Sequence, residues 1–305
     1  MSTLHVLLPA RTGFAAAADW RRWLARADRL PDNPAAREVA VRGLLRFAGD
    51  AVPLAALRHH CHADDAATGT WLCADPAWVR SEATGARLMT WPLADLSAAE
   101  AAELAATLRP LFGDAGMPLT VDTPSAWCVR LADGAPAVPF TEPSRALGVA
   151  MLECLPTGEA GRPWRRLFTE AQVALHAHPV NATRVAAGKQ PVNALWFWGA
   201  GPLPGGVSTG LAAVASHAEV LRGLARIAHI KTLDPAPEAV HAATAGDEVL
   251  LDLGDAAAPV VVQQWWPALR RWLHVGRFTS LALTFASGER FRVRRAHRLR
   301  FWRRA

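Results

Sequence analysis

The chain has no tyrosine, and only two of its 33 Lys and Arg residues are lysines, Lys189 and Lys231. No apolar run reaches the roughly 18 residues that a bilayer-spanning helix needs, so no contact with a membrane is predicted. The first residues lack both a basic segment and a small-residue cleavage site, which argues against a secretory signal. These absences together lead us to expect a cytoplasmic protein.

The chain also lacks a CxxC pair. Its four cysteines are Cys61, Cys73, Cys128 and Cys154. Their spacing excludes a zinc ribbon and a thioredoxin-type redox motif. We therefore expect the thiols to be buried as small apolar side chains.

What the sequence does contain is typical of a globular protein. Its 305 residues are 51% hydrophobic and 20% charged, enough for one large domain or two moderate ones. The net charge of +6 is concentrated at the end, because residues 290–305 include eight arginines and no acid. The remainder is near neutral, so nucleic-acid binding by the whole domain is not predicted. The basic end indicates either a surface for an anionic partner or a two-faced strand whose charges deter edge pairing.

Strand-like and helix-like segments alternate along the chain. Most predicted strands are continuous apolar runs, which favours an α/β sheet covered on both faces. Residues 132–165 are rich in Pro and Gly and predict an irregular excursion. The predicted strands are 4–8, 71–76, 88–91, 126–131, 192–198, 249–253, 259–263 and 280–285, and the predicted helices are 15–29, 35–47, 97–111, 166–176, 211–228 and 267–273.

The strongest candidate site lies between a predicted helix and a buried strand. Five polar residues crowd this turn: His178, Asn181, Arg184, Lys189 and Asn193. Arginine and asparagine donors in such a group suit a phosphate or carboxylate anion. The alternative is structural, in which the asparagines close turns and the arginine forms an ion pair.

Three other motifs are weaker. The run from His59 to Asp65 is rich in His and Asp but has no fixed ligand spacing, so a solvated polar loop competes with a metal site. Residues 206–210 match G-x-S-x-G, yet they lie too far from the preceding strand for a nucleophile elbow, and helix capping by Ser208 or Thr209 is favoured. Residues 199–206 favour a rigid turn over a phosphate loop.

The middle of the chain resembles a known family. The matching residues include His178-Pro179-Val180-Asn181, Arg184, Gly188-Lys189, Pro191-Val192-Asn193-Ala194, Trp198-Gly199-Ala200-Gly201 and the segment 221–226 around Arg222. This block resembles archaeal-type cofactor-independent phosphoglycerate mutases of the alkaline phosphatase superfamily, and more closely their short bacterial regulatory relatives, the RpfE-like proteins. The resemblance implies an α/β fold with a degenerate alkaline-phosphatase-like core, residues 1–70 and 170–305. It also implies an inserted smaller α+β domain, residues 71–169.

In that family a serine nucleophile and two divalent metals, commonly manganese, transfer a phosphoryl group. The sequence departs from this pattern at both metal signatures. Pro9-Ala10 follows the first strand where an Asp-Gly pair belongs, and no acidic, His-rich run follows residues 249–253. We therefore expect no metal and no cofactor, and catalytic residues stay unidentified. Manganese or another divalent metal is expected only if other residues hold it.

Three functions remain open. The first is a mutase-like protein without the two-metal site, regulatory or binding a small phosphorylated or carboxylate ligand or a protein partner. Its candidate residues are His178, Asn181, Arg184, Lys189, Asn193 and Arg222. The second is an active phosphoglycerate mutase or phosphatase with displaced ligands, for example from His59 to Asp65. The third is an interaction module that uses the Arg-rich end.

Overall fold

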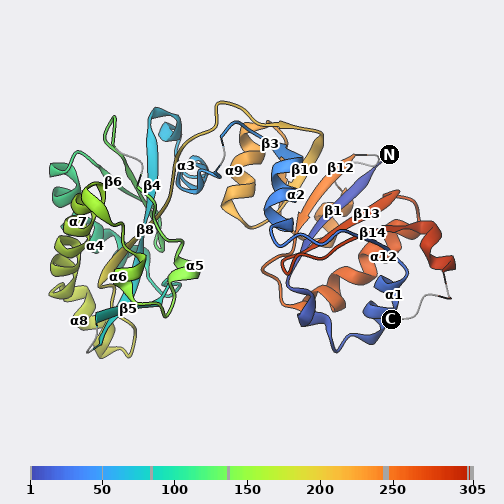
Figure 1. Cartoon of the computed structure of the whole chain (residues 1–305), viewed down its shortest axis with the longest axis horizontal. Helices are drawn as coiled ribbons and strands as arrows, with labels where there is room; N and C mark the ends of the chain where they lie inside the picture. The colour runs from blue at the N-terminus through green and yellow to red at the C-terminus, as the bar shows by residue number, and fades with distance from the viewer. Residues whose placement is uncertain are drawn as a thin grey trace. The chain divides into compact units, whose positions relative to one another are not determined.

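A computed structural model describes residues 2–49, 51–82, 85–135, 138–242, 247–300 and 302. The chain divides into two compact units (Figure 1). We call residues 1–48 with 204–305 the core unit, and residues 49–203 the inserted unit. Each has its own hydrophobic core, so each is described by itself.

The core unit is built on a seven-stranded, mostly parallel sheet. Its strand order is β11-β10-β12-β1-β13-β14-β2, parallel from β11 to β13 and antiparallel at β14 and β2. A short antiparallel pair, β3 with β9, lies apart from it. The strands are β1 (Thr3–Leu8), β2 (Asp28–Leu30), β3 (Leu45–Arg46), β9 (Ser208–Thr209), β10 (Leu211–Ala215), β11 (Lys231–Leu233), β12 (Glu248–Asp252), β13 (Ser280–Phe285) and β14 (Arg290–Arg294).

Both faces of this sheet are buried, as continuous apolar strands require. On one face Leu4 and Val6 of β1 share a cluster with Trp20 and Trp272, which lie on α1 and α12. On the other face Leu7, Val214 and Leu250 are also buried. The helices of the unit are α1 (Ala18–Ala25), α2 (Ala36–Leu44), α9 (Glu219–Ile227), α10 (Pro237–Ala242), α11 (Ala258–Val260) and α12 (Trp266–His274). Two short 3-10 helices, η1 (Arg11–Phe14) and η4 (Arg295–Leu299), and one π-helix, η3 (Val261–Trp265), accompany them.

The inserted unit is built on an antiparallel sheet around the long strand β4 (Thr70–Glu82). This strand pairs with β5 (Gly85–Thr90), β7 (Ala126–Arg130) and β8 (Ala194–Pro202), and β6 (Leu119–Thr123) pairs with β7. Its helices are α3 (Leu54–His60), α4 (Ala98–Asp114), α5 (Pro143–Ala146), α6 (Met151–Cys154), α7 (Gly158–His176) and α8 (Pro179–Ala186), with the turn η2 (Asp65–Thr68).

Several sequence predictions are confirmed. The predicted strands at 4–8, 88–91, 126–131, 192–198, 249–253 and 280–285 correspond to β1, β5, β7, β8, β12 and β13. Helix α4 begins after Ser97, whose side chain caps it while Glu100 completes the capping box. Cys73, Cys128 and Cys154 are buried free thiols as predicted, whereas Cys61 is only half-buried.

Other predictions are wrong. Residues 211–228 form the strand β10 followed by α9, not one helix, so Ser208 and Thr209 lie in β9 and cap nothing. Residues 259–263, predicted as a strand, are helical. Strand β4 does not stop at Asp75-Pro76, because Pro76 faces Leu195 of β8 within the sheet. The excursion at 132–165 contains α5, α6 and the start of α7.

The unit boundaries also differ from the prediction. The predicted division points after residues 70 and 169 both fall inside the inserted unit. The physical reason is that β8 pairs with β4 and α7 packs on β8, which keeps residues 170–203 with that unit. Strand β14 has the predicted two faces, with Phe291 and Val293 buried, but β2 covers it, so it is not an edge strand.

Among the described residues, no helix combines the length and apolar character needed to cross a membrane.

Candidate functional site

The predicted turn is largely occupied by contacts within the chain. Asn181 donates to the carbonyls of Leu175 and Val192 at 2.7 Å each, and its amide oxygen accepts from the Val192 amide at 2.7 Å. Asn193 forms the same kind of paired contact with the backbone of Val79, at 2.8 Å in both directions. Both side chains therefore hold neighbouring segments together rather than facing a ligand.

Arg184 is the most enclosed member of this group, with a fully buried side chain. Its guanidinium donates to Asp95 at 2.8 Å, to Glu100 at 3.1 Å and to the Gln190 carbonyl at 2.8 Å. Burial would raise the pKa of Glu100, but donation from Ser97 and Arg184 outweighs it and the pKa is lowered. These contacts match the structural alternative considered for Arg184 from the sequence.

The other three candidates are more exposed. His178 accepts from the Val180 amide at 3.2 Å and caps α8, and its second ring nitrogen lies 3.1 Å from Thr107. Lys189 is exposed just after α8. Arg222 belongs to the core unit, where it pairs with Asp234 at 3.4 Å, whereas the other five belong to the inserted unit.

The carboxyl edge of the core sheet is where ligands of α/β proteins commonly bind. Asp252 ends β12 at this edge and is almost fully buried. It accepts from Ser216 at 2.9 Å, from the Gly254 amide at 3.1 Å and from Arg37 at 3.2 Å. A guanidinium cation thus neutralises this carboxylate.

Gly254 makes room for this guanidinium. A Cβ atom at residue 254 would overlap Nη1 of Arg37, so a larger residue there would require the guanidinium to move. The observed geometry of the ion pair therefore depends on the space that Gly254 leaves.

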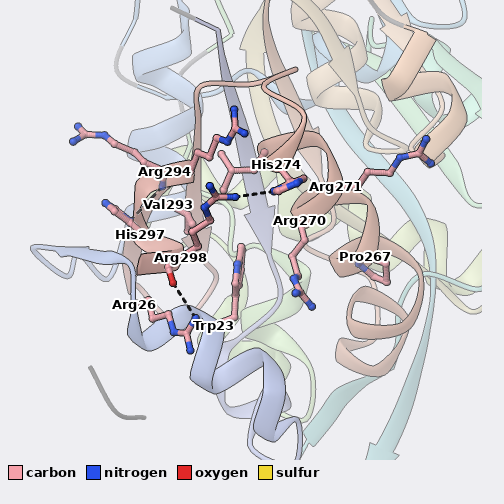
Figure 2. A pocket seen from close by; sticks show the side chains of 12 residues that line it. Trp23, Arg26, Pro267, Arg270, Arg271, His274, Val293, Arg294, His297 and Arg298 are labelled. Carbon is pink, nitrogen blue, oxygen red and sulfur yellow. Dashed lines mark hydrogen bonds between the residues drawn. The ribbon is translucent and has the colours of Figure 1, made fainter. Parts of the chain in front are cut away.

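A basic cavity of about 600 Å³ lies elsewhere in the core unit (Figure 2). Helix α12, the end of β14 and η4 supply most of its walls, and Trp23 adds an apolar surface. Arg298 lies within 3.3 Å of His274, and Arg26 donates to the Arg298 carbonyl at 3.3 Å. The basic lining residues are Arg26, Arg270, Arg271, His274, Arg294, Arg295, His297 and Arg298.

The charged side chains that line this cavity are all of positive sign. Its twelve lining residues include six arginines and two histidines but no Asp or Glu. Like-charged guanidinium groups that line one cavity create a positive potential, which attracts anions. Three of these arginines belong to the basic end of the chain that the sequence singled out, namely Arg294, Arg295 and Arg298.

A second cluster, in the inserted unit, surrounds His59. The sequence favoured a solvated loop for this histidine, but its side chain is only 1% exposed on α3. Its Nδ1 lies 2.7 Å from Asp122 and 3.5 Å from the Cys128 sulfur, and its Nε2 lies 2.8 Å from Asp65. Among the residues described, His59, Asp122 and Cys128 form the only group of three potential metal ligands within 4.8 Å of one another.

Electrostatics at this cluster favour a charged histidine and a neutral thiol. Burial alone would lower the pKa of His59, but hydrogen bonds and charge from Asp122 and Asp65 outweigh it and raise the pKa. Burial, followed by the nearby Asp122 charge, raises the pKa of the Cys128 thiol. Sequence reasoning missed this group because Asp122 and Cys128 lie more than 60 positions from His59, with no local motif around them.

One stretch of the sequence is similar to known proteins. It is 38% identical over 64 residues to the 2,3-bisphosphoglycerate-independent phosphoglycerate mutase of Methanosarcina barkeri, and 39% identical over 64 residues to that of Methanosarcina mazei. A probable mutase of the same kind from Geobacter sulfurreducens is 39% identical over 57 residues. The Methanosarcina matches span 21% of this chain and 16% of each mutase. No protein-family model matches the chain.

The fold comparison covers nearly the whole chain. The PH0037 protein from Pyrococcus horikoshii superposes with a TM-score of 0.52 over 96% of this chain and 87% of its own, at 12% identity. A cofactor-independent phosphoglycerate mutase from Thermoplasma acidophilum gives 0.41 at 16% identity, over 96% and 89%. The predicted α/β fold class is confirmed, because the sheet topology is mixed α/β and the PH0037 protein shares this fold.

Proposed function

We propose that this chain is a phosphoglycerate mutase-like protein that binds a small anionic ligand and does not use two-metal phosphoryl transfer. It would act as a regulatory or ligand-binding protein, as its resemblance to the short bacterial RpfE-like proteins implies. The ligand is a small phosphorylated or carboxylate molecule.

One observation carries this proposal: the basic cavity is lined by six arginines without a single acidic side chain. Guanidinium groups bind phosphate and carboxylate through paired, charge-assisted hydrogen bonds. Trp23 and Leu273 add apolar surface against which the carbon skeleton of a ligand can pack. A volume of about 600 Å³ lies in the range of small-molecule sites.

The contacts of Asp252 support the proposal that the chain does not use two-metal phosphoryl transfer. A divalent metal needs carboxylate oxygens that are free to coordinate it. Asp252 at the carboxyl edge of β12 already accepts from Arg37, Ser216 and the Gly254 amide. Binding a cation there would require displacing a guanidinium for which Gly254 leaves specific room.

Calorimetric titration with 3-phosphoglycerate and with inorganic phosphate tests anion binding. We expect binding that weakens as salt rises, because exposed charges are screened. The double variant Arg271→Gln/Arg298→Gln should lose at least about tenfold in affinity, since two charge-assisted contacts disappear. Arg166→Gln, an exposed arginine on α7 of the inserted unit, is the matched control. Equal affinity in the double variant and the wild type would contradict the proposal.

Turnover assays test the absence of metal chemistry. Purified protein with Mn²⁺ should not interconvert phosphoglycerates or hydrolyse a phosphate monoester. Manganese-dependent turnover that a chelator abolishes would exclude the proposal.

The second candidate function is an active phosphoryl-transfer enzyme with displaced ligands. The convergence of Asp122, Asp65 and Cys128 on His59 favours it, because His59 opens the His-rich run considered in the sequence. This candidate requires turnover that His59→Gln abolishes.

The third candidate function is an interaction module that binds a partner through its Arg-rich end. Truncating that end cannot test this function. Residues 290–294 form β14 between β13 and β2, so removing residues 290–305 would damage the core sheet. Point substitutions of Arg294 and Arg295 keep the strand and test a protein partner directly.

A further inference from the structure

The cluster around His59 brings together three elements of the inserted unit. His59 lies on α3, Asp122 on β6 and Cys128 on β7. The register between β6 and β7 shifts between Val121 and Thr123, so Asp122 lies in a bulge without a paired residue opposite. Bulges re-aim side chains, and here the carboxylate reaches the imidazole of His59 at 2.7 Å.

One atom of the cluster lacks a partner. The Asp122 side chain is only 3% exposed, and its Oδ2 is buried without a hydrogen-bond donor. A buried carboxylate oxygen without a donor is costly, and such an atom in a folded protein calls for a missing ligand such as water or an ion.

The surroundings of His59 match those of a metal-binding histidine. While Nδ1 faces Asp122 and Cys128, the opposite nitrogen Nε2 lies 2.8 Å from the exposed carboxylate of Asp65. Metal-bound histidines usually donate their second ring nitrogen to such a carboxylate, which fixes the ring and its tautomer. The ring of Trp71 packs against the imidazole with centroids 3.9 Å apart and restricts it further.

The distances fit a tetrahedral zinc ion. A nitrogen about 2.1 Å and a sulfur about 2.3 Å from zinc lie roughly 3.5 Å apart in tetrahedral geometry. The observed separation of Nδ1 and the Cys128 sulfur is 3.5 Å. The short contact between Nδ1 and Oδ1 of Asp122 must lengthen by a fraction of an ångström.

We propose that His59 Nδ1, Asp122 and Cys128 bind a single divalent cation of the zinc type. A mixed nitrogen, oxygen and sulfur donor set suits Zn²⁺ better than Mg²⁺ or Mn²⁺, which prefer oxygen. Binding releases the proton on Nδ1 of His59 and the proton of the Cys128 thiol. Three protein ligands leave a fourth position for water.

The burial of this site favours a structural cation and counts against the second candidate function, which needs a substrate at the same cluster. The three ligand side chains are at most 3% exposed, so a phosphorylated substrate has no access to the cation. The cation instead ties α3 to β6 and β7. This inference is independent of anion binding in the core unit, because the two sites share no residue.

Metal content and spectroscopy of the full chain test the site. After chelator treatment and reloading with Zn²⁺, elemental analysis should find one zinc per chain, and Co²⁺ should give a thiolate-to-metal charge-transfer band. Cys128→Ser should abolish that band, whereas Cys154→Ser, a buried cysteine in the same unit, should keep it.

A variant at the exposed Asp65 keeps the test decisive if the buried variants fail to fold. Asp65→Asn should weaken zinc affinity by about 10- to 100-fold, because it removes the orienting carboxylate. Asp64→Asn, at the neighbouring exposed position, is the matched control and should leave the affinity unchanged. Absence of bound zinc in the wild type would overturn the proposal. So would a zinc affinity in Cys128→Ser and Asp65→Asn equal to that of the wild type.

Discussion

Arg184 shows how a residue that resembles a ligand-binding group serves the fold. A fully buried guanidinium requires anionic partners, and Asp95 and Glu100 provide them from the start of α4 and the residues before it. Glu100 has two tasks, since it also completes the capping box with Ser97. Its carboxylate therefore links a helix start to a buried arginine.

The ionisation of Glu100 predicts how the stability of the protein depends on pH. Its pKa is lowered from the ordinary value of 4.5, so the charged form adds stability above pH 4.5, and this is lost as pH falls through the lowered pKa. We expect Glu100→Gln to be less stable than the wild type at neutral pH by on the order of 1 kcal/mol, since the pair is partly exposed. Urea unfolding across pH measures the gap, which should narrow below pH 4.5.

The exposed Glu103 on the same helix provides the control. Glu103→Gln should leave the pH dependence of the wild type intact. A gap between wild type and Glu100→Gln that stays constant from neutral to acidic pH would contradict the assigned role of Glu100.

At the scale of elements, a single carboxylate joins much of the inserted unit. Asp75 on β4 accepts from both terminal nitrogens of Arg58 on α3, at 3.0 and 2.9 Å. It also accepts from the indole nitrogens of Trp91 and Trp198 and from the backbone amide of Trp127. A helix, three strands of one sheet and the segment after β5 thus converge on one side chain that is 1% exposed.

Substitution of Asp75 should be among the most damaging changes in the inserted unit. Asp75→Asn removes the buried negative charge that pairs with Arg58 and accepts from three tryptophans, and we expect a loss of about 3–5 kcal/mol in the free energy of unfolding. Asp114→Asn, at the exposed end of α4, should change it by less than about 0.5 kcal/mol. Chemical denaturation monitored by circular dichroism measures both, and a small effect at Asp75 would refute the role given to this network.

Sequence patterns predicted elements well where the local signal was complete. The capping box at Ser97 and the apolar runs of β1 and β13 are examples. The pattern failed at Leu211–Ala215, because this alanine-rich segment favours helix locally while parallel pairing with β11 and β12 makes it a strand. It failed again at 259–263, where β-branched residues indicated a strand but the segment continues into α12 as helix.

The candidate sites, too, were predictable only where their residues are close together in the sequence. The sequence identified the polar turn around Asn181 and the arginines of the C-terminal segment, since each is contiguous. It could not reveal that Leu175 and Val192 carbonyls occupy Asn181, nor that Arg294 and Arg298 line one cavity with Arg270. Those facts depend on contacts between distant segments.

At the scale of the whole molecule, the two units differ in how the chain builds them. The inserted unit is one continuous segment, residues 49–203, whereas the core unit needs two segments. Strand β1 pairs with β12 and β13, which come from the far end of the chain. Folding of the core unit therefore depends on contacts across more than 240 residues.

This difference predicts which fragment is autonomous. Residues 49–203 expressed alone should unfold cooperatively on heating, because the segment keeps its own core and sheet. Residues 1–48 alone should show no such transition, since β1 would lack both neighbours. Differential scanning calorimetry of the two fragments checks this, and a non-cooperative 49–203 fragment would count against an independent unit.

The close approach of Gly254 to Arg37 has a consequence for evolutionary variation. Because a Cβ at residue 254 would displace the guanidinium from its observed position, the two positions should covary among related genes. A relative with a larger residue at 254 should have a replaced arginine or a guanidinium in another position. The residue pair at positions 37 and 254 would then identify, from sequence alone, which homologous proteins share this arrangement at Asp252.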